Sequence, residues 1–262
     1  MTKADGRLVK NKTILLTGAS QGIGAVTAGR LAESGARLIA HCRSDADIEG
    51  VETALAGTPE DRRHIVTADF EDEAAADRLW ATALEWRDEI DVLILNAAMM
   101  QPIGGIDDDY DTWHAAWQQH LQVNVLAPTR LMYAAVRHFR ERSGGTIVLL
   151  SSWVAQRGVS NPQMMAYAAS KGAIKAVAQS IARGYAADNV LTYILAPGIV
   201  RTKMSLDFAE LQGGEDVVTD TLAMKEWVPP EEVADVIAFL AAGRIRHLSG
   251  ATLDLNGASY VR

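Results

Sequence analysis

Tyr167 and Lys171 are the two residues of this chain best suited to proton-transfer chemistry. They lie four positions apart in a stretch of helical pattern, residues 166–187, so both side chains fall on one helix face. A free tyrosine titrates near pH 10 and is a poor acid or base at neutral pH. A positive charge about 6 Å away, at an effective dielectric constant of about 20, favours the phenolate by roughly 2–3 kcal/mol. We therefore expect Lys171, together with a second positive charge on a bound oxidised cofactor, to lower the pKa of Tyr167, and Tyr167 to act as the proton donor.

Hydroxyl and amide side chains follow two of the predicted strands. Ser151 and Ser152 come at the end of the apolar run 146–151, and Asn96 ends the run 91–96. Taken singly, each is equally explained as a strand-end cap or a turn residue. The carboxyl ends of parallel strands, however, present ligands at one edge of a sheet. We expect these side chains to meet the tyrosine there, with Ser152 rather than Ser151 facing the substrate.

Asn124 is unusual because it lies inside a helical stretch, residues 113–142, where asparagine is a poor helix former. A local break in the helix would free its main-chain carbonyl for a water molecule leading to Lys171. The alternative is a solvent-facing amide with no role in the site.

A glycine-rich turn follows the first predicted strand, in the sequence TGASQGIG of residues 17–24. Gly18 permits a tight turn, Gly22 lets the backbone approach a pyrophosphate, and Gly24 allows the helix to pack closely on the strand. The helix that begins there offers free N–H groups to an anion. A glycine-rich turn without a ligand is the alternative, but the position between strand and helix favours a dinucleotide site.

The end of the second predicted strand indicates which dinucleotide is bound. An acidic residue there selects NAD, whereas a basic residue meets the 2′-phosphate of NADP. Cys42 occupies the expected acidic position, and Arg43 and Ser44 follow it. A guanidinium binds a phosphate bidentately, so we expect NADP(H), with NAD(H) as the alternative. Asp45 and Asp47 are close enough in sequence to neutralise Arg43, which would leave it a solvated arginine.

Strands alternate with helices along the whole chain. Strands are expected at residues 13–17, 37–42, 64–68, 91–96, 146–151, 190–196 and 251–255. Helices are expected at residues 23–34, 71–89, 113–142 (one helix or two) and 166–187, with another beginning at residues 229–230. This alternation predicts an α/β fold of one domain, residues 1–262, with a Rossmann-type doubly wound parallel sheet and helices on both faces.

The segment 198–228 is weakly periodic and too long for a simple connector, so we expect it to be a substrate lid. Apolar residues near it and after the strands are expected either to line a substrate pocket or to belong to the core: Met99, Met100, Trp153, Met164, Met204 and Trp227. Arg157, Arg201 and Lys203 would either meet an anionic substrate or lie on the solvated surface.

Composition excludes several classes of protein. The 262 residues carry a formal net charge of −8, which disfavours nucleic acid as a partner. A single cysteine excludes an internal disulfide and fits the cytoplasm. Residues 1–12 are polar, so we expect neither a signal peptide nor a membrane anchor, and no apolar run is long enough to span a bilayer. The six histidines are not at metal-ligand spacing, so we expect no metal site.

Taken together, the chain resembles the short-chain dehydrogenase/reductase family, of the type with a subunit of roughly 250 residues. The resemblance runs from about Lys10 to the C-terminus and includes the glycine turn, NAA after the fourth strand, YAASK, and PGIVRT at residues 197–202. It implies a catalytic tetrad of Asn124, Ser152, Tyr167 and Lys171. It also implies a set of cofactor-binding residues: Gly18, Ser20, Gln21, Gly22, Ile23, Gly24, Arg43, Ser44, Asp69, Phe70, Asn96, Ala97, Ala98, Tyr167, Lys171, Pro197, Gly198, Val200 and Thr202.

Within that set, the resemblance implies that Asp69 and Phe70 contact the adenine, and that Val200 and Thr202 contact the nicotinamide carboxamide. Ser152, Trp153, Met99 and Met204 would contact the substrate. The resemblance also implies a homodimer or homotetramer packed through the helices around Asn124 and Tyr167.

Four departures from the family pattern stand out. Ala98 replaces a usual glycine, and Gln21 stands where NADP-preferring members often carry arginine. Ser152 precedes Tyr167 by fifteen residues rather than about thirteen, which lengthens the loop before the catalytic helix. Residues 256–258 read NGA instead of the common DGG.

The function expected from these features is NADP(H)-dependent interconversion of a carbonyl and a secondary alcohol. One alternative is a 3-oxoacyl-thioester (acyl-carrier-protein) reductase. Another, of a different class, is a non-catalytic protein that senses a dinucleotide. Fold and motifs do not choose the substrate, because this fold supports many chemistries.

Overall fold

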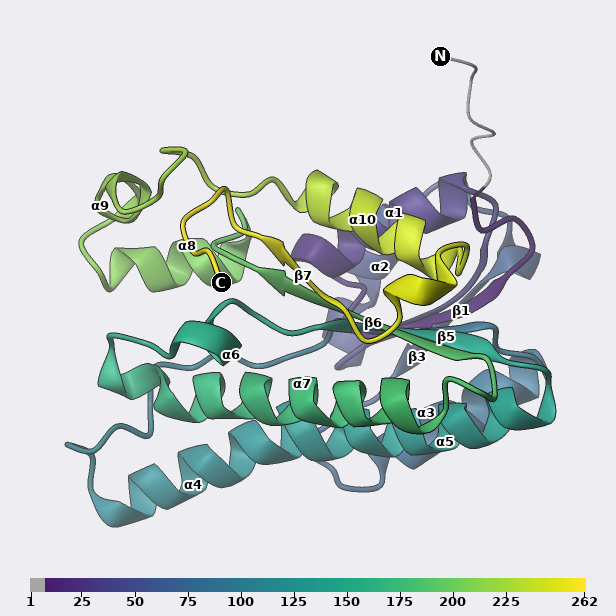
Figure 1. Cartoon of the computed structure of the whole chain (residues 1–262), viewed down its shortest axis with the longest axis horizontal. Coiled ribbons are helices and arrows are strands. Elements are labelled where there is room, and N and C mark those ends of the chain that lie inside the picture. Colours follow the sequence, from purple (N-terminus) through teal and green to yellow (C-terminus); the bar gives the residue numbers. More distant parts are fainter. Residues whose placement is uncertain (1–7) are drawn as a thin grey trace.

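Seven parallel strands form one sheet at the centre of the molecule (Figure 1). The computed structural model describes residues 8–262. The strands are β1 (Thr13–Leu16), β2 (Arg37–Cys42), β3 (Arg63–Thr67), β4 (Val92–Leu95), β5 (Gly145–Leu150), β6 (Val190–Pro197) and β7 (Thr252–Leu255). Their order is β3-β2-β1-β4-β5-β6-β7, and every pairing is parallel. The predicted Rossmann-type doubly wound sheet is confirmed.

Helices cover both faces of this sheet (Figure 1). The helices are α1 (Gly22–Glu33), α2 (Ile48–Ala54), α3 (Ala75–Trp86), α4 (Tyr110–Leu121), α5 (Ala127–Glu141), α6 (Val154–Arg157), α7 (Met165–Gly184), α8 (Lys203–Glu210), α9 (Glu215–Asp220) and α10 (Pro230–Ala241). Apolar side chains of α1, α2 and α10 form the core on one face. Those of α3, α5 and α7 form the core on the other.

The sheet reverses its strand order between β1 and β4, which are hydrogen-bonded neighbours although β2 and β3 separate them in sequence. The loops that follow β1 and β4 lead to helices on opposite faces, so a crevice opens between them at the carboxyl edge of the sheet. The glycine turn leaves β1 at this edge, and Asn96 leaves β4 beside it. The loops after β5 and β6 end at the same edge.

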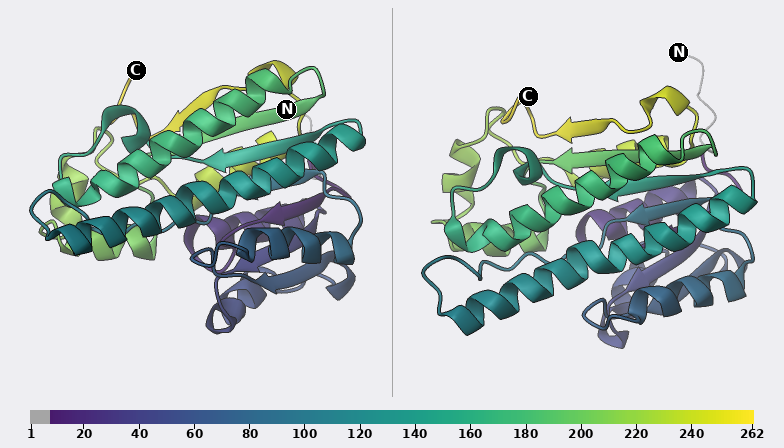
Figure 2. Two further views of the ribbon diagram at one scale, coloured as in Figure 1. Left: turned by 90° about the horizontal axis from the view of Figure 1, so that it is seen from below. Right: turned by 60° about the horizontal axis from the view of Figure 1, so that its bottom comes forward.

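The predicted helical stretch 113–142 is two helices joined by a π-helical turn, Gln122–Leu126. The predicted local break at Asn124 is confirmed, and the asparagine is buried rather than solvent-facing. π-helical turns disturb the regular hydrogen-bond ladder and often occur at functional sites. Figure 2 shows α4 and α7 side by side, with α8 and α9 at the same end of the molecule.

Several short helices were not expected from the sequence. The segment 198–228 carries α8 and α9, and α2 lies between β2 and β3. Each has at most eight residues, too short for apolar periodicity to stand out, so tertiary packing stabilises them rather than intrinsic propensity. Trp153, Val218, Leu222 and Trp227 form a small separate core under α8 and α9.

Two further expectations concern the chain termini and membranes. The prediction that residues 1–12 form neither a signal peptide nor an anchor falls largely on residues 1–7, which lie outside the described part of the chain. Among the described residues, no helix combines the length and the apolar character needed to cross a membrane.

Phe139 provides a test of the core on the α5 face. Its ring is fully buried and packs directly on Gly145, where even a Cβ would lie 2.3 Å from the ring. Phe139→Ala should lower the free energy of unfolding, measured by urea denaturation, by about 3–5 kcal/mol because it leaves a cavity. Phe239 on α10 is 44% exposed, so Phe239→Ala should cost less than about 1 kcal/mol. Equal losses in the two variants would contradict this account of the core.

Candidate functional site

A cavity of about 790 Å³ opens at the carboxyl edge of the sheet, a volume typical of cofactor and ligand sites. Every residue of the expected cofactor set lines it except Ser44, and so do the four expected substrate residues. Ser152, Tyr167 and Lys171 of the expected tetrad line the cavity as well. Asn124 lies behind the wall, next to Val123, which does line it.

The glycine turn is held in shape from β4. Asn96 donates from Nδ2 to the carbonyl oxygens of Thr17 at 3.0 Å and Gly18 at 2.9 Å. A Cβ on Gly24 would lie 1.8 Å from the Gly18 carbonyl oxygen, so only glycine allows helix and turn to approach this closely.

The first turn of α1 has no side-chain cap and no acidic residue, so it presents backbone N–H groups to the cavity. This arrangement fits the pyrophosphate of a dinucleotide, which the dipole at a helix N-terminus also stabilises.

His41 is a residue of the site that the sequence analysis missed. Its Nδ1 accepts a hydrogen bond from the Gly18 N–H at 3.1 Å, and its Nε2 lies 2.7 Å from the Ala68 carbonyl oxygen. The ring also stacks on Phe70, with 4.5 Å between centroids. These two bonds require the neutral imidazole with its proton on Nε2. Burial lowers the pKa of His41 to about 4, which keeps it in that form. A histidine as the penultimate residue of a buried strand was the available signal.

The end of β2 separates Arg43 from the acidic residues that follow it. The carboxylate of Asp47 accepts hydrogen bonds from the backbone N–H and the hydroxyl of Ser44, at 3.1 and 2.8 Å. Ser44 is thereby engaged in a local turn and does not line the cavity. The guanidinium of Arg43 is exposed, lines the cavity, and lies more than 4 Å from every carboxylate of the described residues. The alternative, in which Asp45 or Asp47 neutralises Arg43, is therefore not found.

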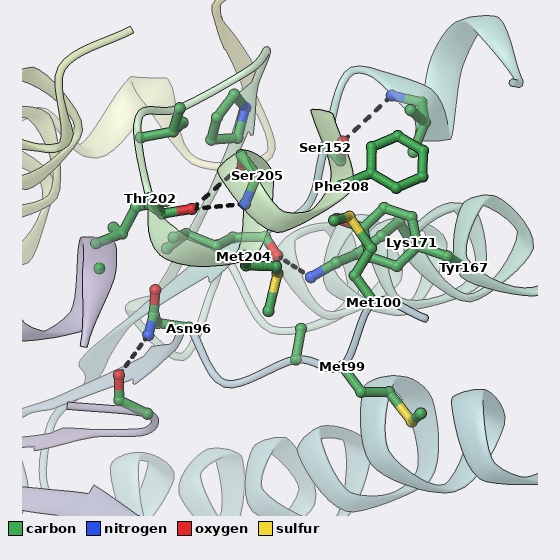
Figure 3. Close-up of a pocket in the computed structure, with 18 of the residues that line it drawn as sticks. Asn96, Met99, Met100, Ser152, Tyr167, Lys171, Thr202, Met204, Ser205 and Phe208 are labelled. Carbon is green, nitrogen blue, oxygen red and sulfur yellow. Dashed lines mark hydrogen bonds between the residues drawn. The ribbon is translucent and has the colours of Figure 1, made fainter. Parts of the chain in front are cut away.

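Tyr167 and Lys171 lie side by side on one face of α7 (Figure 3), with 5.9 Å between Nζ and the ring centroid. Burial raises the pKa of Tyr167 to about 12, and a hydrogen bond with Ser152 acts in the opposite direction. In the protein without a cofactor, burial is thus the largest cause of the shift, and the lowering expected from Lys171 and an oxidised cofactor together stays a prediction. At neutral pH Tyr167 is a protonated donor.

The two serines after β5 have different partners. The Ser151 hydroxyl donates to the carbonyl oxygen of Lys171 at 3.1 Å, which fastens α7 to the end of the strand. The Ser152 hydroxyl accepts from the Val154 N–H at 3.4 Å and lines the cavity together with Tyr167. Both serines line the cavity, so the expectation that Ser152 rather than Ser151 faces the substrate stays a prediction.

Lys171 is almost completely buried, and its ammonium donates to the carbonyl oxygen of Leu150 at 3.0 Å. Burial lowers the pKa of Lys171 to about 8. Because that value still lies above neutrality, the side chain remains mainly an ammonium at pH 7. The fixed carbonyl partner determines where this charge sits relative to Tyr167.

Asn124 connects the loop after β4 to the catalytic helix. Its Oδ1 accepts from the Met99 N–H, and its Nδ2 donates to the Met99 carbonyl oxygen, both at 2.9 Å. The same Nδ2 lies 3.0 Å from the Ser170 hydroxyl, which in turn donates to the Tyr167 carbonyl oxygen at 2.7 Å. The side chain is thus a bridge between Met99 and α7. Its expected role through the main-chain carbonyl and a water molecule stays a prediction.

The end of the cavity beyond Tyr167 is lined by apolar side chains. Figure 3 shows Met99, Met100, Met204 and Phe208 around Tyr167. Phe208 was not expected from the sequence, although its i, i+4 spacing from Met204 on α8 could have indicated it.

Of the two alternatives for Trp227, the pocket or the core, the structure shows the core. Trp227 is buried in the small core under α9 and donates from Nε1 to the Thr219 hydroxyl at 2.8 Å.

Comparisons with known proteins agree with this site. A family model described as Enoyl-(Acyl carrier protein) reductase matches residues 18–257. Dehydrogenase/reductase SDR family member 4 of Bos taurus is 31% identical over 251 residues, which cover 95% of this chain and 87% of the relative. Glucose 1-dehydrogenase of Gluconobacter oxydans is 30% identical over 247 residues, covering 94% of this chain and 91% of the relative.

A solved structure is similar over nearly the whole length. The 3-oxoacyl (acyl-carrier-protein) reductase of Agrobacterium tumefaciens C58, with NADP bound, superposes with a TM-score of 0.86 and 27% identity. The match covers 98% of this chain and 97% of that one. The three proteins differ in their described activities, so similarity indicates the family rather than the substrate.

His41 should make stability fall in mild acid. Its folded-state pKa of about 4 lies below the ordinary 6.5, so between these values only the unfolded chain takes up the proton. Lowering the pH from 7 to 5 should therefore cost about 2 kcal/mol of unfolding free energy through this residue. His41→Gln should be less stable than wild type at pH 7, and the difference should shrink by that amount at pH 5.

Urea denaturation at both pH values measures this effect. His114 is exposed on α4, so His114→Gln should retain the wild-type pH dependence. A stability difference between wild type and His41→Gln that is the same at pH 7 and pH 5 would show that the buried imidazole does not titrate as described.

Proposed function

Because the chain belongs to the short-chain dehydrogenase/reductase family, we propose that it is an NADP(H)-dependent oxidoreductase that interconverts a carbonyl and a secondary alcohol. One observation carries the proposal. The phenol of Tyr167 faces a cavity between the Ser152 hydroxyl and the buried Lys171 ammonium, and the uncapped start of α1 opens into the same cavity. A proton donor and a pyrophosphate cradle in one cavity suit reduction by a dinucleotide.

The chain's own residues supply the proton and the positioning. In the reductive direction Tyr167 donates its phenolic proton to the carbonyl oxygen, and the Ser152 hydroxyl donates a hydrogen bond that holds this oxygen in place. A pKa of about 12 keeps the proton on Tyr167 until the oxygen becomes more basic during the reaction. Lys171 then stabilises the phenolate with its nearby positive charge. Asn124 keeps the Met99 loop and α7 at a fixed distance.

The residues at the other end of the cavity fit NADP(H). The glycine turn and the start of α1 would hold the pyrophosphate, Asp69 and Phe70 the adenine, and Arg43 the 2′-phosphate. When bound, NADPH supplies the hydride that Tyr167 complements with a proton. Near Tyr167, Val200 and Thr202 line the cavity where the nicotinamide carboxamide is expected. The NADP-bound reductase of the same fold supports this choice, and NAD(H) remains the alternative.

A second candidate is reduction of a 3-oxoacyl thioester. The similar Agrobacterium 3-oxoacyl reductase favours it, and the description of the matching family model shares only the acyl-carrier thioester. Assays that compare acetoacetyl thioesters with free ketones and sugars separate the two functions.

We also propose that the segment 198–228 acts as a lid and that the protein forms a homodimer or homotetramer in the cytoplasm.

Tyr167→Phe removes the proton donor and leaves the ring in place. NADPH-dependent carbonyl reduction should fall by about 10³-fold or more, while NADPH affinity, measured by fluorescence titration, should change less than about threefold. Tyr133→Phe alters an exposed tyrosine of α5 and should leave both quantities unchanged. Full turnover in Tyr167→Phe would exclude Tyr167 as the donor. A wild-type protein that binds NADPH but reduces no carbonyl would favour a dinucleotide sensor.

Arg43→Ala tests cofactor selection. Loss of a bidentate guanidinium–phosphate contact should raise the KM for NADPH by roughly 10- to 100-fold, whereas the KM for NADH should change by less than about twofold. Steady-state kinetics with both cofactors measure this. A similar increase for both would mean that Arg43 does not contact the 2′-phosphate.

A further inference from the structure

The part of the cavity beyond Tyr167 differs in charge from the part that receives the dinucleotide. The carboxylates that line the cavity, Asp47, Asp69 and Glu71, all follow β2 and β3 at the cofactor end. Around Tyr167 the described lining contains thioethers, aromatic rings and neutral polar groups, but no carboxylate. An apolar substrate body is favoured there, and an anionic group would meet no repulsion from the wall.

From the sequence, each of three cationic residues near this end could either bind an anionic substrate or lie on the solvated surface. The structure distinguishes the three residues from one another. Arg201 donates from Nη2 to Glu215 at 3.1 Å and does not line the cavity. Lys203 lines it, but its ammonium is paired with Asp207 at 2.6 Å. Arg157 lines the cavity, and no carboxylate of the described residues lies within 4 Å of it.

Arg157 is also held in a definite place. Its guanidinium carbon lies 4.1 Å from the centre of the Trp153 ring. Trp153 is itself buried, and its backbone N–H donates to the Pro197 carbonyl oxygen at 3.0 Å. Stacking uses the flat face of a guanidinium and leaves its N–H edge free for two parallel hydrogen bonds to a carboxylate. The arginine is thus partly ordered before a ligand arrives, which lowers the entropy lost on binding.

The distance from the reacting group suits a substrate of moderate size. Trp153 directly follows Ser152, and the Arg157 N–H closes the helical turn of α6 onto the Trp153 carbonyl oxygen at 3.2 Å. At about 1.5 Å of helical rise per residue, the backbone of Arg157 lies roughly 6 Å from that of Trp153, the N-cap of α6. The indole ring of Trp153 lines the cavity and provides an apolar surface for the body of the substrate.

We propose that Arg157, stacked on Trp153, binds a carboxylate of the substrate, so that the preferred substrates are apolar oxo acids whose carboxylate is separated from the reacting carbonyl by an aromatic or aliphatic body. This inference rests on the proposed function, because it assigns the substrate class of the same site. One guanidinium balances one carboxylate charge. A neutral sugar would use neither Arg157 nor the methionine-rich wall.

The kinetic test compares matched substrates that differ only in charge. With NADPH, 4-acetylbenzoate and 4-(4-acetylphenyl)butanoate are measured against their methyl esters. Wild type should prefer the better of the two acids over its ester by roughly tenfold in kcat/KM, and the preference should weaken at high salt. Arg157→Gln should abolish the preference and leave the esters within about twofold of wild type. Arg157→Lys should retain part of the preference for the acid, because lysine keeps the positive charge but lacks the two parallel N–H donors of a guanidinium.

Arg137→Gln is the matched control. Arg137 is also exposed and stacked on an aromatic ring, that of Tyr133, but it lies on α5 outside the cavity. The Arg137→Gln variant should keep the wild-type preference for the acid over its ester. Wild type that does not prefer either acid, or Arg157→Gln that still prefers the acid, would overturn the inference.

A binding experiment separates failure of this inference from failure of the proposed function. Calorimetry on the protein saturated with NADP⁺ compares 4-phenylbenzoate with 4-phenylbenzamide, neither of which can be reduced at a ketone. Tighter binding of the carboxylate that disappears in Arg157→Gln supports the anion site even if no ketone is turned over. In that case the proposed reductase function fails while the site remains. Equal binding of the two compounds by wild type would overturn the anion site whatever the turnover.

Discussion

The parallel pairing of β1, β4, β5 and β6 is the constraint on which the site depends. Parallel strands in register end at the same edge of the sheet, so the glycine turn, Asn96 and the two serines meet although long stretches of chain separate them. Side-chain hydrogen bonds then fix this edge: Asn96 holds the glycine turn, and Ser151 holds α7. The position of Tyr167 therefore follows from backbone pairing that involves none of the catalytic side chains.

Burial of ionisable groups is offset by specific backbone partners. The Lys171 ammonium donates a hydrogen bond to the Leu150 carbonyl oxygen. His41 uses both ring nitrogens to join the glycine turn to the end of β3. An unpartnered polar group in these places would cost several kcal/mol. Because each group is bonded to backbone, the charge beside Tyr167 and the shape of the cradle are set by the fold itself.

The two ends of the cavity suit two different kinds of molecule. The cofactor end combines free backbone N–H groups, Arg43 and a histidine–phenylalanine stack, which fit phosphates and a flat base. The other end combines methionine and aromatic side chains with the guanidinium of Arg157, which no carboxylate of the described residues approaches within 4 Å. Methionine adapts its shape more readily than branched residues, so this end accepts bulky apolar groups. Tyr167 lies between the two ends, where the proposed reaction needs its proton donor.

The sequence by itself determined that the sheet is parallel and doubly wound, and it located the glycine turn and the Tyr167/Lys171 pair. Each of these depends on local periodicity or on fixed spacing. The sequence also indicated the break at Asn124, since asparagine is a poor helix former. Tertiary structure decided what depends on partners distant in sequence. It showed that burial raises the pKa of Tyr167 in the protein without a cofactor, and it placed Trp227 in a small core. It added His41 and Phe208 to the site, and it distinguished Arg157 from Arg201 and Lys203, because ion pairing depends on which side chains meet in space.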